Sequence, residues 1–469
     1  MSSDGDRWWR NAAIYQIYPR SFQDSDGDGI GDLPGIVSRL DHLVDLGVDG
    51  LWLSPIYPSP LADFGYDISD YTAVDPVFGT LEDFDRLVEE AAARGLRVLM
   101  DLVPCHTSVE HPWFRDHPDR YVWASGRDGG PPNNWQSAFG GPAWSRDPAG
   151  GDRWYLHSFY PEQADLDWRD PEVVEAFGEV VRFWLDRGVA GFRVDAIDRL
   201  LKDPELRDDD PAAVAALEFG HDLSPGDATP VPPPAGPGGA SPPIPSPAGQ
   251  APAGGPGGAS PPRISSRNAP DIPEALAKLR AAAGDALLVG EVFLPAPQVA
   301  PYLGSLDATF AFDLFHAPWE AGALQAAVEA QLELPGTPAW TLSNHDFPRL
   351  PDRYGEEAVA DAARLICSLP GLVFIYQGDE IGMRDGPGHD PPFDRAGRDA
   401  HRHPMQWDGS PNGGFTTGTP WLALVDPAER NVADQRADPD SLLNLYRDLL
   451  AWRRQMTGEA AGGTPPADP

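Results

Sequence analysis

The chain has 469 residues and a formal net charge of −37, with 41% hydrophobic and 10% aromatic residues. This length suits one large domain with insertions, or two to three domains, and the apolar content is sufficient for a core. The negative charge excludes nucleic acid and anionic membrane surfaces as partners, because both would repel the chain, and it favours a neutral ligand. No apolar run of about 18 residues predicts a membrane span.

The N-terminal residues 1–10 are polar and contain no apolar segment of the kind that secretion signals carry. The two cysteines, Cys105 and Cys367, fall at a predicted strand end and in a predicted helix. A disulfide framework is therefore not indicated, and we expect a cytoplasmic protein. The sequence makes no prediction of the oligomeric state.

Short apolar segments alternate with helical patterns along the chain. We expect strands at residues 13–18, 48–54, 96–103, 191–196, 287–292, 309–314, 339–343 and 371–376, and helices at residues 35–46, 80–94, 171–187, 272–283, 298–303, 322–332, 356–369 and 440–454. Strands that alternate with helices in this way predict an α/β fold, a parallel (β/α)8 TIM barrel rather than an open sheet. In such barrels the chemistry takes place at the C-terminal ends of the strands.

The pattern also predicts segments outside the barrel, which we assign to residues 1–103 and 170–455. Residues 104–169 are polar and rich in tryptophan, which predicts a subdomain inserted after the third strand. Residues 224–262 consist almost entirely of Pro, Gly, Ala and Ser, so they predict a disordered insertion that cannot bury enough apolar surface to fold. A long loop follows the eighth strand at residues 377–439, and we expect the tail at 456–469 to be unstructured.

The strand at residues 191–196 reads Gly-Phe-Arg-Val-Asp-Ala. Arg193 and Asp195 are two residues apart, so their side chains point to the same face. The arginine favours the ionised form of the carboxylate and orients it, as a nucleophile requires. The alternative is a buried ion pair without a catalytic role.

Polar residues also follow other predicted strands. They are Asp63 and Tyr66 after the second, Asp101 and His106 at the third, Glu291 at the fifth, and Asn344, His345, Asp346 and Arg349 at the seventh. Any one of these carboxylates can be structural, but together they suit cleavage of a glycosidic bond, which needs an acid and a second carboxylate. Neighbouring strands lie about 4.8 Å apart, which suits the carboxylate separation of about 5–5.5 Å found in retaining glycosidases. Apolar neighbours of Glu291 would raise its pKa, as a general acid requires.

These motifs resemble the alpha-amylase family of glycoside hydrolases (glycoside hydrolase family 13), and within it the exo-acting alpha-glucosidase and oligo-1,6-glucosidase branch. Residues 101–106, 191–195, 291 and 344–346 are similar to the first four signatures of the family, and residues 163–167 and 371–383 to two more. The resemblance covers about residues 8–454.

The resemblance implies that Asp195 is the nucleophile, Glu291 the acid/base and Asp346 the residue that stabilises the transition state. Arg193, His106 and His345 would line the same sugar subsite. A pair formed by Asp63 and Arg349, together with Tyr66, would close the pocket behind the terminal glucose. Ala196, which follows the nucleophile in place of valine, implies action on alpha-1,4 rather than alpha-1,6 linkages.

Residues 24–32 place acidic oxygens at every second position, with glycines that allow a tight turn. This spacing suits a hard cation. A complete EF-hand would have a glutamate where Gly35 stands, so we do not expect this loop to form one. The resemblance implies a structural calcium site, with magnesium as an alternative ion. Its ligands would be Asp24, Asp26, Asp28, Asp32 and the Ile30 carbonyl. The alternative is a solvated acidic turn, and no cofactor is expected for catalysis.

Two features depart from the family pattern. Cys105 stands where the family usually has asparagine, so a hydrogen-bond donor and acceptor are lost, and we interpret the cysteine as a small apolar substitute. A C-terminal β-sandwich that many family members carry is expected to be absent or truncated.

The resemblance therefore predicts a retaining alpha-glucosidase that releases terminal glucose from short oligosaccharides or disaccharides through a covalent glucosyl-aspartate. A transglucosylase, or a sucrose- or trehalose-acting enzyme of the same family, remains an alternative. A catalytically inert sugar-binding relative is another, which the presence of Asp195, Glu291 and Asp346 disfavours. An aldolase-like barrel would need a buried lysine, and Lys202 and Lys278 are expected in polar or helical segments.

Overall fold

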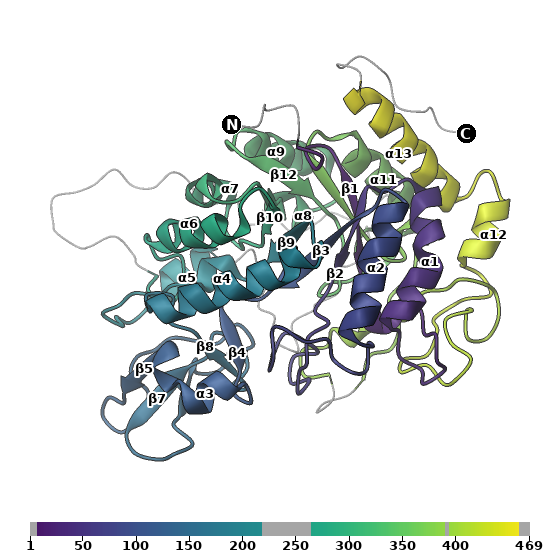
Figure 1. The fold of residues 1–469 in the computed structure, drawn as a ribbon. Coiled ribbons are helices and arrows are strands. Elements are labelled where there is room, and N and C mark those ends of the chain that lie inside the picture. The colour runs from purple at the N-terminus through teal and green to yellow at the C-terminus, as the bar shows by residue number, and fades with distance from the viewer. Residues whose placement is uncertain (1–6, 218–263, 390–393, 459–469) are drawn as a thin grey trace, which may run out of the picture.

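A closed barrel of parallel strands forms the centre of the protein (Figure 1). The structure, a computed structural model, describes residues 7–217, 264–389 and 394–458, so the predicted insertion at 224–262 lies outside the described residues. Around the barrel the strands are β1 (Ala13–Ile17), β13 (Leu372–Tyr376), β12 (Thr337–Trp340), β11 (Ala308–Phe310), β10 (Leu287–Gly290), β9 (Gly191–Val194), β3 (Arg97–Leu102) and β2 (Gly50–Leu53). The predicted (β/α)8 barrel is confirmed.

Helices surround the barrel and cover its outer surface (Figure 1). The longer ones are α1 (Leu33–Leu46), α2 (Leu81–Ala93), α4 (Pro171–Asp186), α6 (Ile272–Ala283), α9 (Ala321–Leu332), α11 (Val359–Ser368) and α13 (Leu442–Gly458). The shorter ones are α3 (Pro112–Asp116), α5 (Pro211–Leu217), α7 (Ala296–Val299), α8 (Phe312–Phe315), α10 (Leu350–Tyr354) and α12 (Val432–Ala437). Within the described ranges, no helix has both the length and the apolar character that a membrane span requires.

Several predicted boundaries differ from the structure. The strand expected at residues 309–314 ends at Phe310, and the following residues form the short helix α8. A short aromatic run is compatible with either state, and contacts of Phe312 with Phe310 and Phe315 decide the helix here. The tail expected from residue 456 also begins later, because α13 continues to Gly458 and packs against α11.

The barrel register brings three chemically important strands together. β9 lies between β3 and β10, and Arg193 of β9 is opposite Asp101 of β3 and Val289 of β10. Asp195 and Glu291 follow β9 and β10 directly. Because parallel strands end at the same rim of the barrel, all these side chains meet at one place.

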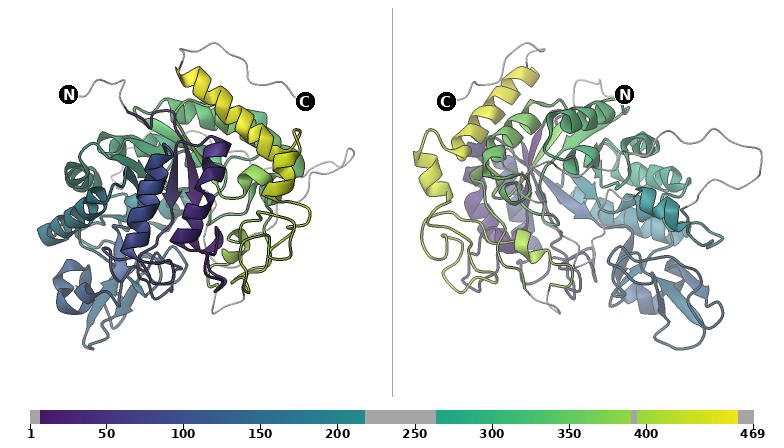
Figure 2. Two further views of the ribbon diagram at one scale, coloured as in Figure 1. Left: turned by 45° about the vertical axis from the view of Figure 1, so that its right-hand side comes forward. Right: turned by 180° about the vertical axis from the view of Figure 1, so that it is seen from behind.

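Residues 104–169, which we call the inserted lobe, lie between β3 and α4 and form two small antiparallel sheets. One pairs β4 (His106–Ser108) with β8 (Gln163–Asp165), and the other contains β5 (Trp123–Ser125), β7 (Arg153–Leu156) and β6 (Trp144–Arg146). A separate apolar cluster that includes Trp135, Trp144 and Leu156 holds the lobe together. Figure 2 shows the lobe projecting from one end of the barrel.

Candidate functional site

A cavity of about 330 Å³ lies at the rim formed by the C-terminal ends of the barrel strands, next to the inserted lobe. This volume is at the lower end of the range for small-molecule sites. Its lining includes Asp63, Tyr66, His106, Phe139, Phe159, Asp195, Glu291, Asp346 and Arg398. The predicted residues Arg193 and His345 contact these lining residues from the barrel side.

One buried guanidinium holds the carboxylates of this site in place. Nη1 of Arg193 donates to Asp101 over 2.8 Å and to Asp195 over 2.5 Å, and Nη2 donates to Glu291. Asp195 and Glu291 therefore bind neighbouring nitrogens of the same side chain, and both face the cavity. The backbone N–H of Ala196 donates a further hydrogen bond to Glu291 over 3.0 Å.

This N–H reaches Glu291 because the chain turns sharply after β9. Ala196 has a φ of 47°, in the left-handed region that residues other than glycine rarely adopt. Such outliers persist only where the surroundings enforce them, and here they occur next to the two central carboxylates. The turn connects Asp195 and Glu291 through the backbone as well as through Arg193.

The two carboxyl groups differ in their affinity for a proton. Burial raises the pKa of Glu291 to about 8, since the attraction of Arg193 is partly offset by the charge of Asp195. Burial also raises the pKa of Asp195, to about 7, although Arg193 opposes the shift. Glu291 therefore keeps its proton at a pH at which Asp195 can already ionise. A carboxyl group with a raised pKa is what a general acid needs at neutral pH.

Asp346 lies in a different electrostatic environment. Burial alone would raise its pKa, but the charges of Arg398 and Arg402 lower it well below the usual range. Both arginines donate to its Oδ1 over 2.9 Å. His345 itself is neutral, because burial lowers its pKa to about 3, and its ring stacks on Tyr66. Asp346 is thus the permanently charged acid of the site.

The predicted pairing of Asp63 with Arg349 is wrong. Asp63 accepts hydrogen bonds from Arg398 and, over 2.9 Å, from Gln163. Arg349 directly precedes α10, and its guanidinium turns to the Gln377 carbonyl over 2.8 Å and lies over a tyrosine ring of β13. Arg398 comes from the loop after β13, where no motif marked it, so sequence reasoning missed the residue that closes this end of the cavity.

The inserted lobe contributes aromatic side chains that the sequence analysis did not single out. Phe139 lies under the guanidinium of Arg398, with 5.2 Å between the guanidinium carbon and the ring centre, and it stacks on Tyr160. Phe159 packs edge-on against His106. The lobe therefore covers the closed end of the cavity with apolar surface. Only a general enrichment of aromatic residues in this segment pointed to such a role.

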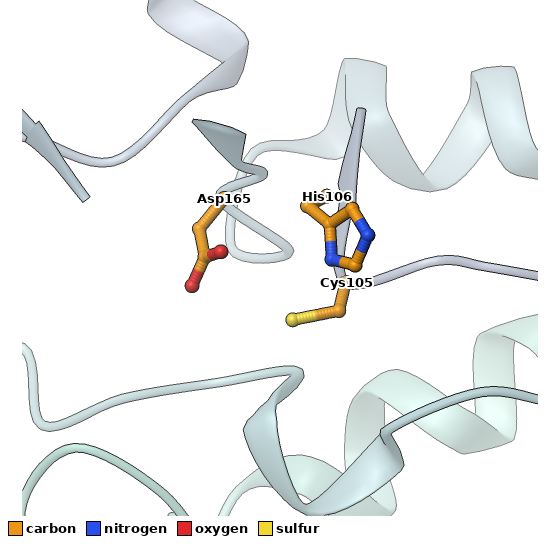
Figure 3. Close-up of side chains that lie close together, drawn as sticks. All are labelled: Cys105, His106 and Asp165. Atoms are coloured by element: carbon orange, nitrogen blue, oxygen red, sulfur yellow. The ribbon is translucent and has the colours of Figure 1, made fainter. Parts of the chain in front are cut away.

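Cys105, His106 and Asp165 form a buried cluster beside the cavity (Figure 3). Lys202, which is 3% exposed, forms an ion pair with Asp165, and its Nζ lies 3.8 Å from the Cys105 sulfur. The chain itself thus supplies the cation that balances Asp165. Burial raises the pKa of the Cys105 thiol well above its usual value, so the side chain is neutral.

The location expected for Lys202 is therefore wrong, because this lysine is buried. Burial lowers its pKa, but Asp165 more than compensates, and the net shift is upward. The amine remains protonated and cannot act as a Schiff-base nucleophile, which needs a free amine. The aldolase-like interpretation consequently gains no support.

The structure brings part of the acidic loop together. One carboxylate oxygen each from Asp24, Asp26 and Asp28 lie within 4.8 Å of one another. Asp32 has another task, since it caps α1 by accepting from Gly35 N over 2.6 Å and also accepts from Ser25 N. A donor set made only of oxygens fits a hard cation such as Ca²⁺.

Comparison with known proteins places this geometry in context. The family model described as the catalytic domain of alpha amylase matches residues 16–460. A probable alpha-glucosidase of Rhizobium meliloti (strain 1021) is 40% identical over 97% of this chain and 84% of its own length. The oligo-1,6-glucosidase of Parageobacillus thermoglucosidasius is 36% identical over 96% and 84%, respectively. The crystal structure of the alpha-glucosyl transfer enzyme XgtA superposes with a TM-score of 0.83 at 38% identity, covering 96% of this chain and 85% of that one.

The ion pair between Lys202 and Asp165 predicts a specific pattern of stability. Replacing Lys202 with methionine strands a buried carboxylate, so Lys202→Met should lower the free energy of unfolding by about 3–5 kcal/mol. Adding Asp165→Asn removes the stranded charge and should restore part of the loss. Melting temperatures of the two variants and the wild type test this expectation. Equal melting temperatures for Lys202→Met and the wild type would contradict it.

Proposed function

The chain belongs to the alpha-amylase family of glycoside hydrolases, and we propose that it is a retaining alpha-glucosidase that releases terminal glucose from short oligosaccharides or disaccharides. The observation that carries this proposal is the Arg193 fork, which holds Asp195 and Glu291 on adjacent nitrogens. Retaining enzymes need their two carboxyl groups close together, whereas inverting enzymes leave room for a water molecule between them. The fork supports the closer arrangement.

In the proposed mechanism, the terminal glucose fills the end of the cavity closed by Asp63 and Arg398. Asp195 attacks the anomeric carbon while Glu291 protonates the leaving oxygen, which gives a covalent glucosyl-aspartate. The negative charge of Asp195 helps to raise the pKa of Glu291, and that charge disappears in the ester. The pKa of Glu291 then falls, so the same group can take a proton from the water that releases glucose.

Asp346 supports this chemistry by remaining ionised throughout. The anomeric centre becomes positively charged in the transition state, and a fixed carboxylate beside it stabilises that charge. Arg398 and Arg402 keep Asp346 in its ionised form and fix its orientation. His345 and Tyr66, stacked against each other, support the wall next to it.

Transfer of glucose to a second sugar is the other candidate activity. The similarity to a solved alpha-glucosyl transfer enzyme favours it, and the carboxylates would act identically with a sugar or a water acceptor. For linkage, Ala196 lines the cavity directly after Asp195, and on the family resemblance we propose a preference for alpha-1,4 bonds. Product analysis with maltose, isomaltose, sucrose and trehalose separates these possibilities.

We also propose that the loop of Asp24, Asp26 and Asp28 binds a structural Ca²⁺. The converging carboxylates support this, and the loop is anchored by a hydrogen bond from Thr416 to Asp24. The site would stabilise the fold and would supply no catalytic chemistry. Its ligands come from one continuous turn, so binding would fix that turn before α1.

The configuration of the first product tests the proposed reaction. Two displacements at the anomeric carbon retain its configuration, so NMR of a fresh reaction mixture should show alpha-glucose before mutarotation produces the beta anomer. Asp195→Asn should lose at least about a thousandfold in kcat, because the amide is not a nucleophile. Asp41→Asn, at an exposed surface pair, is the matched control and should retain activity. Initial release of beta-glucose would disprove retention.

The pH dependence follows from the two central acids. Activity requires ionised Asp195 and protonated Glu291, so kcat/KM should rise as pH increases through about 7 and fall again above about 8. In Glu291→Gln, assayed with alpha-glucosyl fluoride, the fall at high pH should disappear because fluoride leaves without a proton. A high-pH limb that is unchanged in this variant would remove Glu291 from the role of acid.

The calcium proposal predicts a metal-dependent melting temperature. A ligand present at 100 times its Kd and bound only by the folded state adds about 2.7 kcal/mol of stability. Chelation with EDTA should therefore lower the melting temperature, and added Ca²⁺ should restore it. In Asp26→Ala both treatments should have little effect. An EDTA response that persists in Asp26→Ala would rule out this loop as the site.

A further inference from the structure

We propose that Asn134 and Asp209 form a staple that shapes the side of the cavity occupied by the leaving group, and that this staple selects a second sugar at that position. Asn134 would contact this sugar, and Asp209 would act as a positioning residue. The inference rests on the proposed alpha-glucosidase function, which it extends from the terminal glucose to its neighbour.

The cavity has two chemically different ends. At one end Asp63, Arg398 and Asp346 bind one another, and the aromatic side chains of the lobe cover them. The remaining lining residues include Asn134, Asp209, Pro211, Val214 and Ser266. A substrate whose terminal glucose fills the closed end extends its leaving group into the rest of the cavity, which these residues help to line. We call Asn134, Asp209 and Ser266 the leaving-group wall.

Asn134 and Asp209 join the inserted lobe to the segment before α5. The Asn134 side chain accepts from Asp209 N over 2.7 Å and donates to Asp209 O over 2.9 Å, so both ends of its amide are engaged. Trp135 Nε1 donates to Arg207 O over 2.8 Å, and Asn133 Nδ2 donates to Leu206 O over 3.1 Å. Three consecutive residues of the lobe thus bind residues between Leu206 and Asp209.

The carboxylate of Asp209 adds a third segment to the wall. Its Oδ1 accepts from the backbone N–H groups of Ser265 over 2.6 Å and Ser266 over 3.0 Å. Asp209 is 9% exposed, so these hydrogen bonds are largely protected from water. Segments that are distant in sequence, including the lobe, therefore meet at a single residue on the edge of the cavity.

The backbone is strained at Leu206, close to the leaving-group wall. Leu206 has a φ of 50°, a left-handed conformation that residues other than glycine rarely adopt. Its side chain packs against the Trp135 and Trp144 cluster of the lobe. Strain of this kind persists where the surroundings enforce it, and it gathers at sites that hold ligands. The turn at Leu206 directs the chain that continues to Asp209, three residues later.

The composition of the wall points to a sugar as the leaving group. The polar residues Asn134, Gln136 and Ser266 line the cavity together with the apolar residues Pro211 and Val214. A site that offers fixed hydrogen-bonding groups discriminates strongly against a ligand that cannot satisfy them. Loss of the staple should therefore weaken the use of disaccharides more than the use of a substrate without a second sugar.

The test compares two substrates that share the terminal glucose. Alpha-glucosyl fluoride fills the closed end but places no sugar against the wall, whereas a disaccharide does both. The measured quantity is the ratio of kcat/KM for the disaccharide that the wild type cleaves fastest, among the four named above, to kcat/KM for the fluoride. In Asn134→Ala and Asp209→Ala this ratio should fall about tenfold. Asp209→Asn keeps an acceptor oxygen for Ser265 and Ser266, so its ratio should lie closer to the wild-type value than that of Asp209→Ala.

Arg127→Ala is the matched control. Arg127 donates to Asp208 over 3.3 Å and so joins the same two segments, but the contact is exposed and outside the cavity. The ratio for Arg127→Ala should equal that of the wild type.

Two outcomes would overturn the proposal. One is an unchanged ratio in Asn134→Ala with a wild-type melting temperature, and the other is an equal fall of the ratio in Arg127→Ala. If Asp209→Ala does not fold, Asn134→Ala and Asp209→Asn decide the matter. Failure of the wild type to cleave either substrate would refute the proposed function instead.

Discussion

The site depends on one buried arginine that serves three acids. Arg193 is 2% exposed and contacts Asp101, Asp195 and Glu291, which come from three neighbouring strands or their ends. A single positive charge cannot balance three ionised carboxylates in a buried site, so the group retains protons at neutral pH. Burial raises the pKa of each of the three acids above its usual value, although Arg193 opposes the shift. The proposed catalysis by an acid and a nucleophile depends on this charge imbalance.

Asp346 is also a buried aspartate, but its pKa is lowered, whereas that of Asp195 is raised. It is buried like Asp195, but it has two arginines of its own and remains ionised. These arginines come from the loop after β13, whereas Arg193 lies within a barrel strand. Arg193 of the barrel thus holds Asp195 and Glu291, whereas arginines of the loop after β13 keep Asp346 ionised.

The segments outside the barrel line much of the cavity in front of these acids. The inserted lobe supplies Phe139 and Phe159 over the closed end and Asn134 on the leaving-group wall. The loop after β13 supplies Arg398, which contacts both Asp63, in the segment after β2, and the Phe139 ring of the inserted lobe. Folds of this kind support different specificities because loops on one rim vary while the strand ends retain the chemistry.

The sequence by itself determined the barrel and the placement of Asp195, Glu291 and Asp346 at its rim. Their signals are local, because alternation along a strand sets the side-chain direction and the end of a parallel strand fixes the rim. The tertiary structure alone decided the partners of those residues. Arg349 is close to Asp346 in sequence, yet the start of α10 turns it away, and Arg398 reaches Asp63 from a distant loop. Lys202 was expected in a polar segment, and only its ion pair with Asp165 shows why a charged side chain is buried there. Contacts between distant segments depend on how whole elements pack, and no local pattern of residues encodes that packing.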